Sequence, residues 1–112
     1  MDISAEREGG AVIARANGRV DSSNSREFHS SLEAVINKDD PAVVLDFEDV
    51  SYISSAGMRV ILLTAKGLQS SGVKFVLCSM NESIREVFQI SGFDKIIPIH
   101  GSQSEALAAV SA

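Results

Sequence analysis

The chain has 112 residues, of which 45% are hydrophobic and 22% are charged, a balance typical of one globular domain. Its formal charge of −5 disfavours nucleic acid as the main partner, since binding to DNA or RNA depends on Lys and Arg neutralising phosphates. The N-terminus lacks the basic and apolar regions of a signal peptide, and no apolar run approaches the ~20 residues that span a bilayer. The one cysteine, Cys78, cannot form an internal disulfide. We therefore expect a cytoplasmic protein without membrane contact.

The first half of the chain predicts a hairpin, a helix and a buried strand. Residues 2–8 alternate weakly, and Gly9-Gly10 indicates a tight turn into a second strand that ends near Val20. Capping residues at 21–25 predict the start of a helix, with Asp21 as a candidate cap, and Pro41 ends that helix. Residues 42–47 are apolar except for Asp46, which predicts a central strand followed by an acidic turn at 48–49.

The second half alternates between helix and strand. A helix after Ser55 is expected to end at residues 70–72, before a buried strand at 73–78. Asn81 is expected to cap the next helix, which ends at 91–92. Residues 96–99 predict a short last strand, placed at the sheet edge by Pro98, and Ser102 begins a C-terminal helix. The residues expected on the inner sides of the two middle helices are Met58, Ile61, Leu62, Ala65 and Leu68, and then Ile84, Val87 and Phe88.

This order of elements predicts an α/β fold. A leading antiparallel hairpin, followed by alternating helices and strands, implies a mixed sheet of about five strands with about four helices packed on it. The sequence shows no internal repeat, linker or low-complexity segment. We expect a single domain over residues 1–112.

Ser55 is the candidate functional residue. A hydroxyl at the start of a helix lies beside free backbone N–H groups and the positive end of the helix dipole, which both favour added negative charge. A phosphate could therefore be accommodated at Ser55, although the same position also suits a plain N-cap serine. The sequence around Ser55 offers no catalytic base, no metal-ligand spacing and no cofactor motif. We interpret Ser55 as a switch and expect neither an enzyme, nor a metal site, nor a cofactor.

Residues 46–58, with the sequence Asp-Phe-Glu-Asp-Val-Ser-Tyr-Ile-Ser-Ser-Ala-Gly-Met, resemble the STAS family, named for sulphate transporters and anti-sigma factor antagonists. Residues 18–24 resemble the family's Gly-x-x-Asp segment before the first helix, residues 79–88 resemble its late strand-to-helix passage, and residues 91–97 resemble the segment before its last strand. The resemblance covers nearly the whole chain and implies one STAS domain.

The resemblance also implies a mechanism. Antagonists of this family bind an anti-sigma factor that is also a serine kinase, and so free a sigma factor. The kinase, which binds the ATP, phosphorylates one serine of the antagonist and releases it; a serine phosphatase restores the binding form. The acceptor falls on Ser55, with Ser54 as the less favoured alternative. The free protein is expected to be a monomer.

The sequence departs from the family at two places. Ser54 stands where many members have Asp, and Met58-Arg59 stands where many have Leu-Gly, so Arg59 could alter partner choice or contact a phosphate. Val60 and Leu63 are expected to point partly outward, either as ordinary scattered apolar residues of the surface or as an apolar centre for partner binding. The predicted partner-binding residues are Asp21, Ser22, Ser54, Ser55, Ala56, Gly57, Met58, Arg59, Val60 and Leu63.

Two other functions stay open at this point. The first is a STAS interaction subunit of a transport or stressosome-like assembly that uses the same surface without being phosphorylated. The second, less favoured, is a small α/β enzyme.

Overall fold

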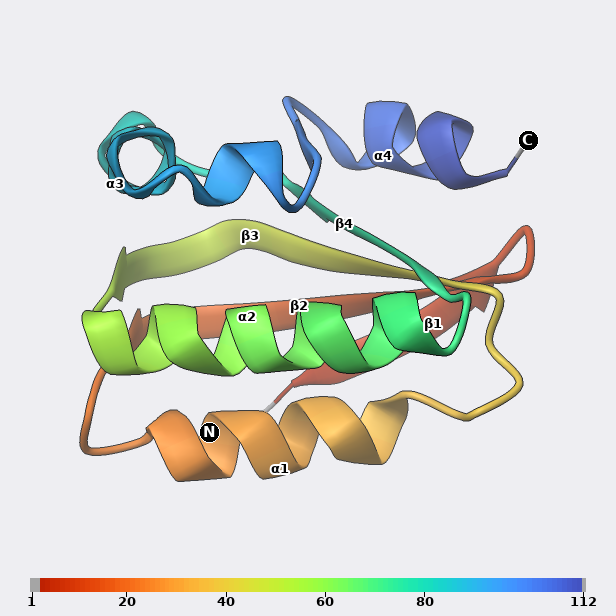
Figure 1. The fold of residues 1–112 in the computed structure, drawn as a ribbon, viewed down its shortest axis with the longest axis horizontal. Helices are drawn as coiled ribbons and strands as arrows, with labels where there is room; N and C mark the ends of the chain where they lie inside the picture. The colour runs from red at the N-terminus through yellow and green to blue at the C-terminus, as the bar shows by residue number, and fades with distance from the viewer. Residues whose placement is uncertain (1–2, 112) are drawn as a thin grey trace.

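The computed structural model describes residues 3–111, which form one mixed five-stranded sheet with helices packed on it (Figure 1). The strands lie in the order β1-β2-β3-β4-β5. The hairpin of β1 (Ser4–Glu8) and β2 (Ala11–Val20) is antiparallel, whereas β3 (Ala42–Ile53), β4 (Lys74–Cys78) and β5 (Ile99–His100) each run parallel to the preceding strand. The predicted α/β fold, its leading hairpin and the central place of β3 are confirmed.

Four α-helices cover the sheet within the described residues: α1 (Ser25–Val35), α2 (Ser55–Ser70), α3 (Glu82–Ser91) and α4 (Gln103–Val110). The larger core cluster joins the sheet to Phe28 and Leu32 of α1, Ile61 of α2 and Phe88 of α3. A smaller cluster joins it to Ala106 and Val110 of α4. Figure 1 shows that α1 and α2 run side by side and begin at the end of the molecule where β3 ends. None of the described helices is long and apolar enough to cross a bilayer.

The predicted acidic turn after residue 47 is wrong, because β3 continues through Glu48 and Asp49 to Ile53. The pairing of β2 with β3 shifts register twice, between Arg15 and Asn17 and again between Gly18 and Arg19. Such bulges interrupt the alternation of inward and outward side chains, so Glu48 and Asp49 both face solvent from within a strand.

The last strand is shorter and later than predicted. Residues 93–95 form a 3-10 turn (Phe93–Lys95), and β5 pairs with β4 only at Leu77↔Ile99 and Cys78↔His100. The position of β5 at the sheet edge is as expected from Pro98, whose carbonyl still accepts a hydrogen bond from the N–H of Leu77 at 3.0 Å.

Candidate partner-binding site

The start of α2 differs by one residue from the position predicted for the cap. Ser54 is the N-cap: its Oγ accepts a hydrogen bond from the N–H of Gly57 at 3.3 Å, and its own N–H donates to the carbonyl of Val20 at 2.8 Å. Ser55 is the first helical residue and is exposed. The hydroxyl of Ser54 is therefore used within the fold, whereas Ser55 faces outward.

Gly57 allows α2 to begin close to the sheet. A Cβ atom on Gly57 would lie 2.7 Å from Cγ1 of Val20 and 2.8 Å from Cγ1 of Ile53, closer than carbon atoms can approach. The helix can lie against the ends of β2 and β3 only because this side chain is missing. Gly57 is buried, and the close approach that it allows fixes where Ser55 lies relative to the sheet.

The first turn of α2 carries no acidic residue. The other helices each have one in their first turn: Glu27 in α1, Glu82 in α3 and Glu105 in α4. A carboxylate at that position compensates the positive end of the helix dipole. The start of α2 therefore keeps its favourable field for negative charge next to the exposed hydroxyl of Ser55.

The loop between β2 and α1 lies at the same end of the molecule. Asp21 accepts hydrogen bonds from the N–H and the hydroxyl of Ser23, which lower the pKa of its carboxyl. Asn24 accepts from the N–H of Asp21 at 2.9 Å and donates to the carbonyl of Arg19 at 2.8 Å. The N-cap position of α1 is Asn24, so the prediction that Asp21 caps α1 is wrong: Asp21 orders the loop, with Ser22 exposed.

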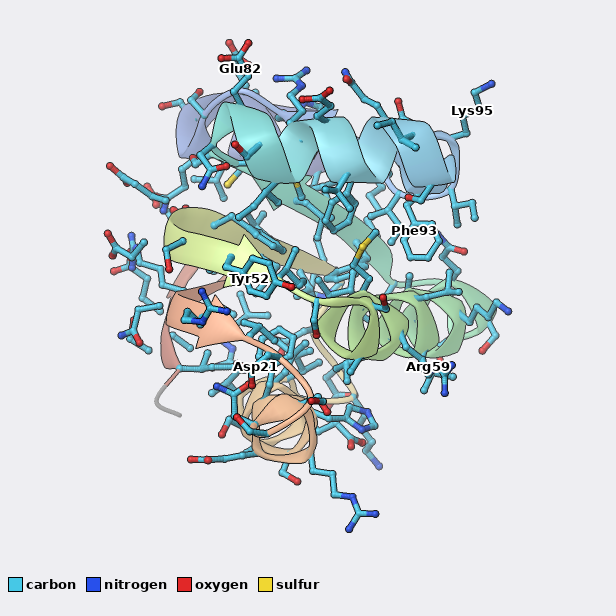
Figure 2. All side chains as sticks on the ribbon, turned by 90° about the vertical axis from the view of Figure 1, so that its left-hand side faces the viewer. Asp21, Tyr52, Arg59, Glu82, Phe93 and Lys95 are labelled. Atoms are coloured by element: carbon cyan, nitrogen blue, oxygen red, sulfur yellow. The ribbon has the colours of Figure 1, made fainter. Side chains whose placement is uncertain are left out.

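Arg19 and Tyr52 form a pair that the sequence pattern did not indicate. The guanidinium carbon of Arg19 lies 4.3 Å from the centroid of the Tyr52 ring, a cation–π geometry, and its Nε lies 3.9 Å from the carboxylate of Asp21. Figure 2 looks onto this end of the molecule, with Tyr52 and Asp21 beside the start of α2. The bulged register of β2 and β3, which sets Arg19 opposite Tyr52, brings the pair together.

An apolar groove of about 370 Å³ begins at Ser55 and runs between α2 and α3. Its most exposed wall is Ile90, which is 80% exposed, and Val87 is 43% exposed. Behind them, Phe88 makes edge-to-face contacts with Phe47 and Phe93, each at a centroid distance of 6.0 Å. The residues that line the groove are Ser55, Met58, Val87, Ile90, Ser91 and Phe93.

Two predicted side-chain orientations are wrong. Val60 is only 8% exposed and belongs to the larger core cluster, because α2 is packed both on the sheet and beside α1, so its buried stripe is wider than one face. Val87, expected on the inner side of α3, lies at its edge and lines the groove instead. Periodicity identified Ile84 and Phe88 correctly, and Ile90, off that face, was the signal of an exposed apolar surface.

The other predicted site residues differ in exposure and position. Ser22 and Arg59 are exposed, Ala56 is half-buried, and Met58 is buried but lines the groove between α2 and α3. Leu63 is exposed on the side of α2 that faces α1, away from the α3 groove. Asp21, Ser54 and Ser55 lie at one end of the molecule, where the N–H of Ser54 donates to the carbonyl of Val20, the residue before Asp21.

A comparison with protein families matches residues 2–106 to the STAS domain. Among curated proteins, BtrV of Bordetella bronchiseptica, which is named as a candidate anti-sigma factor antagonist, is 41% identical over 97% of this chain and 94% of its own length.

Comparison with solved structures identifies the same fold. The crystal structure of TM1081 from Thermotoga maritima, described as a candidate anti-sigma factor antagonist, has a TM-score of 0.91 and 28% identity over 98% of this chain and 95% of that one. The anti-sigma factor antagonist SpoIIAA shares the fold, with a TM-score of 0.69 and 20% identity over 96% of each chain in its unphosphorylated form. Its phosphorylated form gives 0.71 and 21% over 96% and 98%. The chain belongs to the STAS domain family.

Proposed function

We propose that this chain is an anti-sigma factor antagonist that binds a serine-kinase anti-sigma factor, frees a sigma factor, and is released when Ser55 is phosphorylated. The observation that carries the proposal is the exposed hydroxyl of Ser55 at the start of α2, on the rim of an apolar groove. The names of the relatives agree with this role. SpoIIAA, which has the same fold, has been solved in unphosphorylated and phosphorylated forms.

The proposed docking surface combines three neighbouring features. The groove between α2 and α3 offers exposed apolar area at Val87 and Ile90, which an apolar side chain of the partner would cover. The Asp21–Ser22 loop and the Arg19–Tyr52 pair supply polar contacts at the same end. An apolar centre with a polar rim is the usual arrangement of a protein–protein interface.

The switch follows from the charge of a phosphate. Phosphorylation of Ser55 adds about −1.5 to −2 charges at pH 7. In the free protein this charge would be solvated and stabilised by the start of α2. In the complex it would lie at the edge of an apolar contact, where losing its hydration costs several kcal/mol. The phosphorylated form therefore favours the free state, and a serine phosphatase would restore binding.

Ser55 is a better acceptor than Ser54 in this structure. The Oγ of Ser54 accepts the capping hydrogen bond from Gly57, so a kinase could reach it only by opening the first turn of α2. Ser55 is exposed, and among residues 3–111 its hydroxyl has no such contact to break. The ATP would be bound by the kinase, in the cytoplasm where sigma factors act.

The test is to capture the partner and map the phosphate. The chain is used to isolate an ATPase-fold kinase from its own cells, and the pair is incubated with ATP and analysed by mass spectrometry. We expect one phosphate on Ser55, none in the Ser55→Ala variant, and normal incorporation in Ser54→Ala. Full phosphorylation of Ser55→Ala would contradict the assignment. Isolation of a transporter or scaffold subunit without phosphorylation would favour the alternative role as an assembly subunit.

A further inference from the structure

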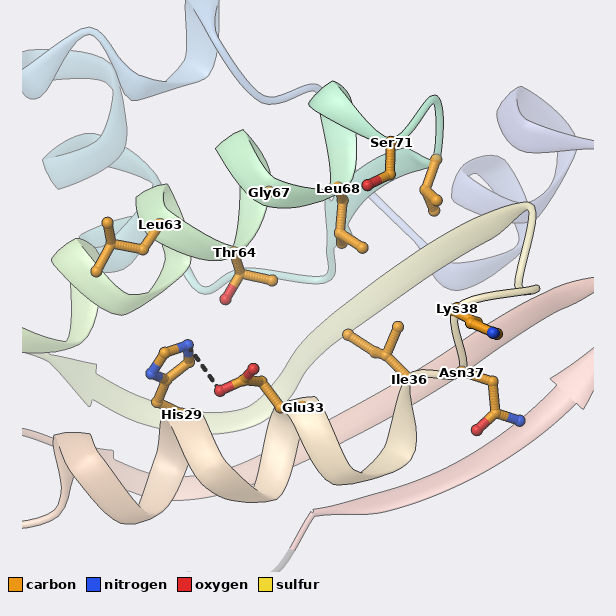
Figure 3. Close-up of a pocket in the computed structure, with 11 residues that line it drawn as sticks. His29, Glu33, Ile36, Asn37, Lys38, Leu63, Thr64, Gly67, Leu68 and Ser71 are labelled. Carbon is orange, nitrogen blue, oxygen red and sulfur yellow. Dashed lines mark ion pairs between the residues drawn. The ribbon is translucent and has the colours of Figure 1, made fainter.

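A second hollow, of about 350 Å³, lies between α1 and α2 and shares no residue with the groove beside Ser55 (Figure 3). Its walls include the apolar side chains of Ile36, Leu68 and Val73. Such a volume falls in the range of small-molecule sites, which are mostly apolar with a few well-placed polar groups.

Thr64 supplies a polar group inside this hollow. The residue is only 9% exposed, and its Oγ1 atom is buried without a hydrogen-bond partner among the described residues. A threonine within a helix commonly donates to the carbonyl four residues earlier, which would satisfy it. Here the hydroxyl points across the hollow toward α1 (Figure 3). Buried polar atoms in native proteins nearly always have a partner, so this one requires an explanation.

Gly67, three residues after Thr64, keeps the same wall of the hollow open. Glycine is unfavourable inside a helix, and nothing in the packing requires it here, since a Cβ atom at Gly67 would meet no atom within 4 Å. Gly57 in the same helix is different, because a Cβ there would collide with Val20 and Ile53. The missing side chain at Gly67 gives access to the hollow next to the Thr64 hydroxyl.

The charged groups lie at the rim and do not call for a charged ligand. Nε2 of His29 and Oε1 of Glu33 lie 3.2 Å apart, so these two side chains satisfy each other. Lys38, at the far end, is exposed to solvent. Among the described residues that line this hollow, the buried polar atom without a hydrogen-bond partner is Oγ1 of Thr64, which is neutral.

We propose that this hollow binds a small neutral molecule with an apolar body and one hydroxyl or carbonyl oxygen. The body would pack against Ile36, Leu68 and Val73, and the oxygen would exchange a hydrogen bond with Oγ1 of Thr64. A hydroxyl both donates and accepts, so Thr64 suits either an alcohol or a carbonyl compound.

The test uses a matched pair of probes, p-cresol and toluene, which differ by one hydroxyl. The titration is followed by amide chemical shifts in NMR spectra of the full chain. We expect saturable shifts centred on Thr64, Gly67 and Leu68, and an affinity roughly 10-fold higher for p-cresol than for toluene, the worth of one hydrogen bond. Equal affinities, or shifts that do not saturate at these amides, would overturn the proposal.

Two variants locate the binding. Thr64→Val removes the hydroxyl and keeps the shape, so p-cresol should fall to the affinity of toluene while toluene binding stays unchanged, which also shows that the site remains folded. Gly67→Leu should fill the hollow and abolish binding of both probes, with a melting temperature equal to or above that of the native chain. Undiminished p-cresol binding by either variant would refute the site.

Discussion

Ser54 and Ser55 are neighbours of the same type with different tasks. The hydroxyl of Ser54 accepts a hydrogen bond from the N–H of Gly57, which satisfies one of the free donors of the helix start. Ser55 follows in the first turn, where α2 has no acidic residue to balance its dipole. A negative group at Ser55 would be favoured by the helix dipole and would use an exposed hydroxyl, whereas modification of Ser54 would involve the Oγ that accepts the capping hydrogen bond.

This difference predicts opposite effects on stability. Ser55→Asp should raise the free energy of unfolding by about 0.5 kcal/mol, through the helix dipole. Ser54→Ala should lower it by about 1 kcal/mol, through loss of the cap. Urea denaturation of the two variants measures both. A clear destabilisation by Ser55→Asp would show that the start of α2 does not favour negative charge.

Cys78 gives a second prediction at this scale. Burial raises the pKa of its thiol to about 11, from an ordinary value of 9.0. The thiol should therefore react slowly with iodoacetamide at pH 8 in the native protein and rapidly in urea. Because the unfolded chain loses this proton first, stability should fall as the pH rises from 9 toward 11, and Cys78→Ala should weaken that fall. Rapid alkylation of the native protein would show that the Cys78 thiol is not buried.

At the scale of elements, α2 contains two glycines in opposite surroundings. Gly57 lies against Val20 and Ile53, at the end of the helix that presents Ser55. Gly67, in the second half of the helix, faces open space. Replacing each glycine by alanine should therefore change the free energy of unfolding in opposite directions.

Gly57→Ala should lower the free energy of unfolding by about 1–3 kcal/mol, because the new methyl group overpacks the contact with β2 and β3. Gly67→Ala should raise it by up to about 1 kcal/mol, because alanine favours the helix. Thermal and urea denaturation compare them directly. If Gly57→Ala were neutral, α2 would not start in close contact with the sheet.

The exposed edge of α3 provides the next prediction. Ile90→Asp should leave stability nearly unchanged, because the side chain is exposed, but weaken kinase binding at least about 10-fold, because a charge would enter an apolar contact. Ile96→Asp is the matched control, since Ile96 is also exposed but lines a different hollow with Pro98 and Val110. Equal binding by the native chain and Ile90→Asp would remove the groove from the interface.

At the scale of the whole molecule, the order of the strands and helices and the position of α2 could be predicted from the sequence, because hydrophobic periodicity and capping residues are local signals. The extension of β3 to Ile53 was missed, since it depends on bulged pairing with β2, a contact between distant segments. The burial of Val60 was missed for a similar reason, as it depends on how α2 is surrounded. The groove at Ile90 forms only when α2 and α3 come together.

We propose that a phosphate on Ser55 ends binding to the kinase. The most direct measurement is calorimetric titration of the isolated kinase with the unmodified chain and with the chain phosphorylated on Ser55. We predict that the phosphorylated chain binds roughly 100-fold more weakly, which corresponds to about 2.7 kcal/mol, and that phosphatase treatment restores the affinity. Equal affinity of the two forms would contradict the account.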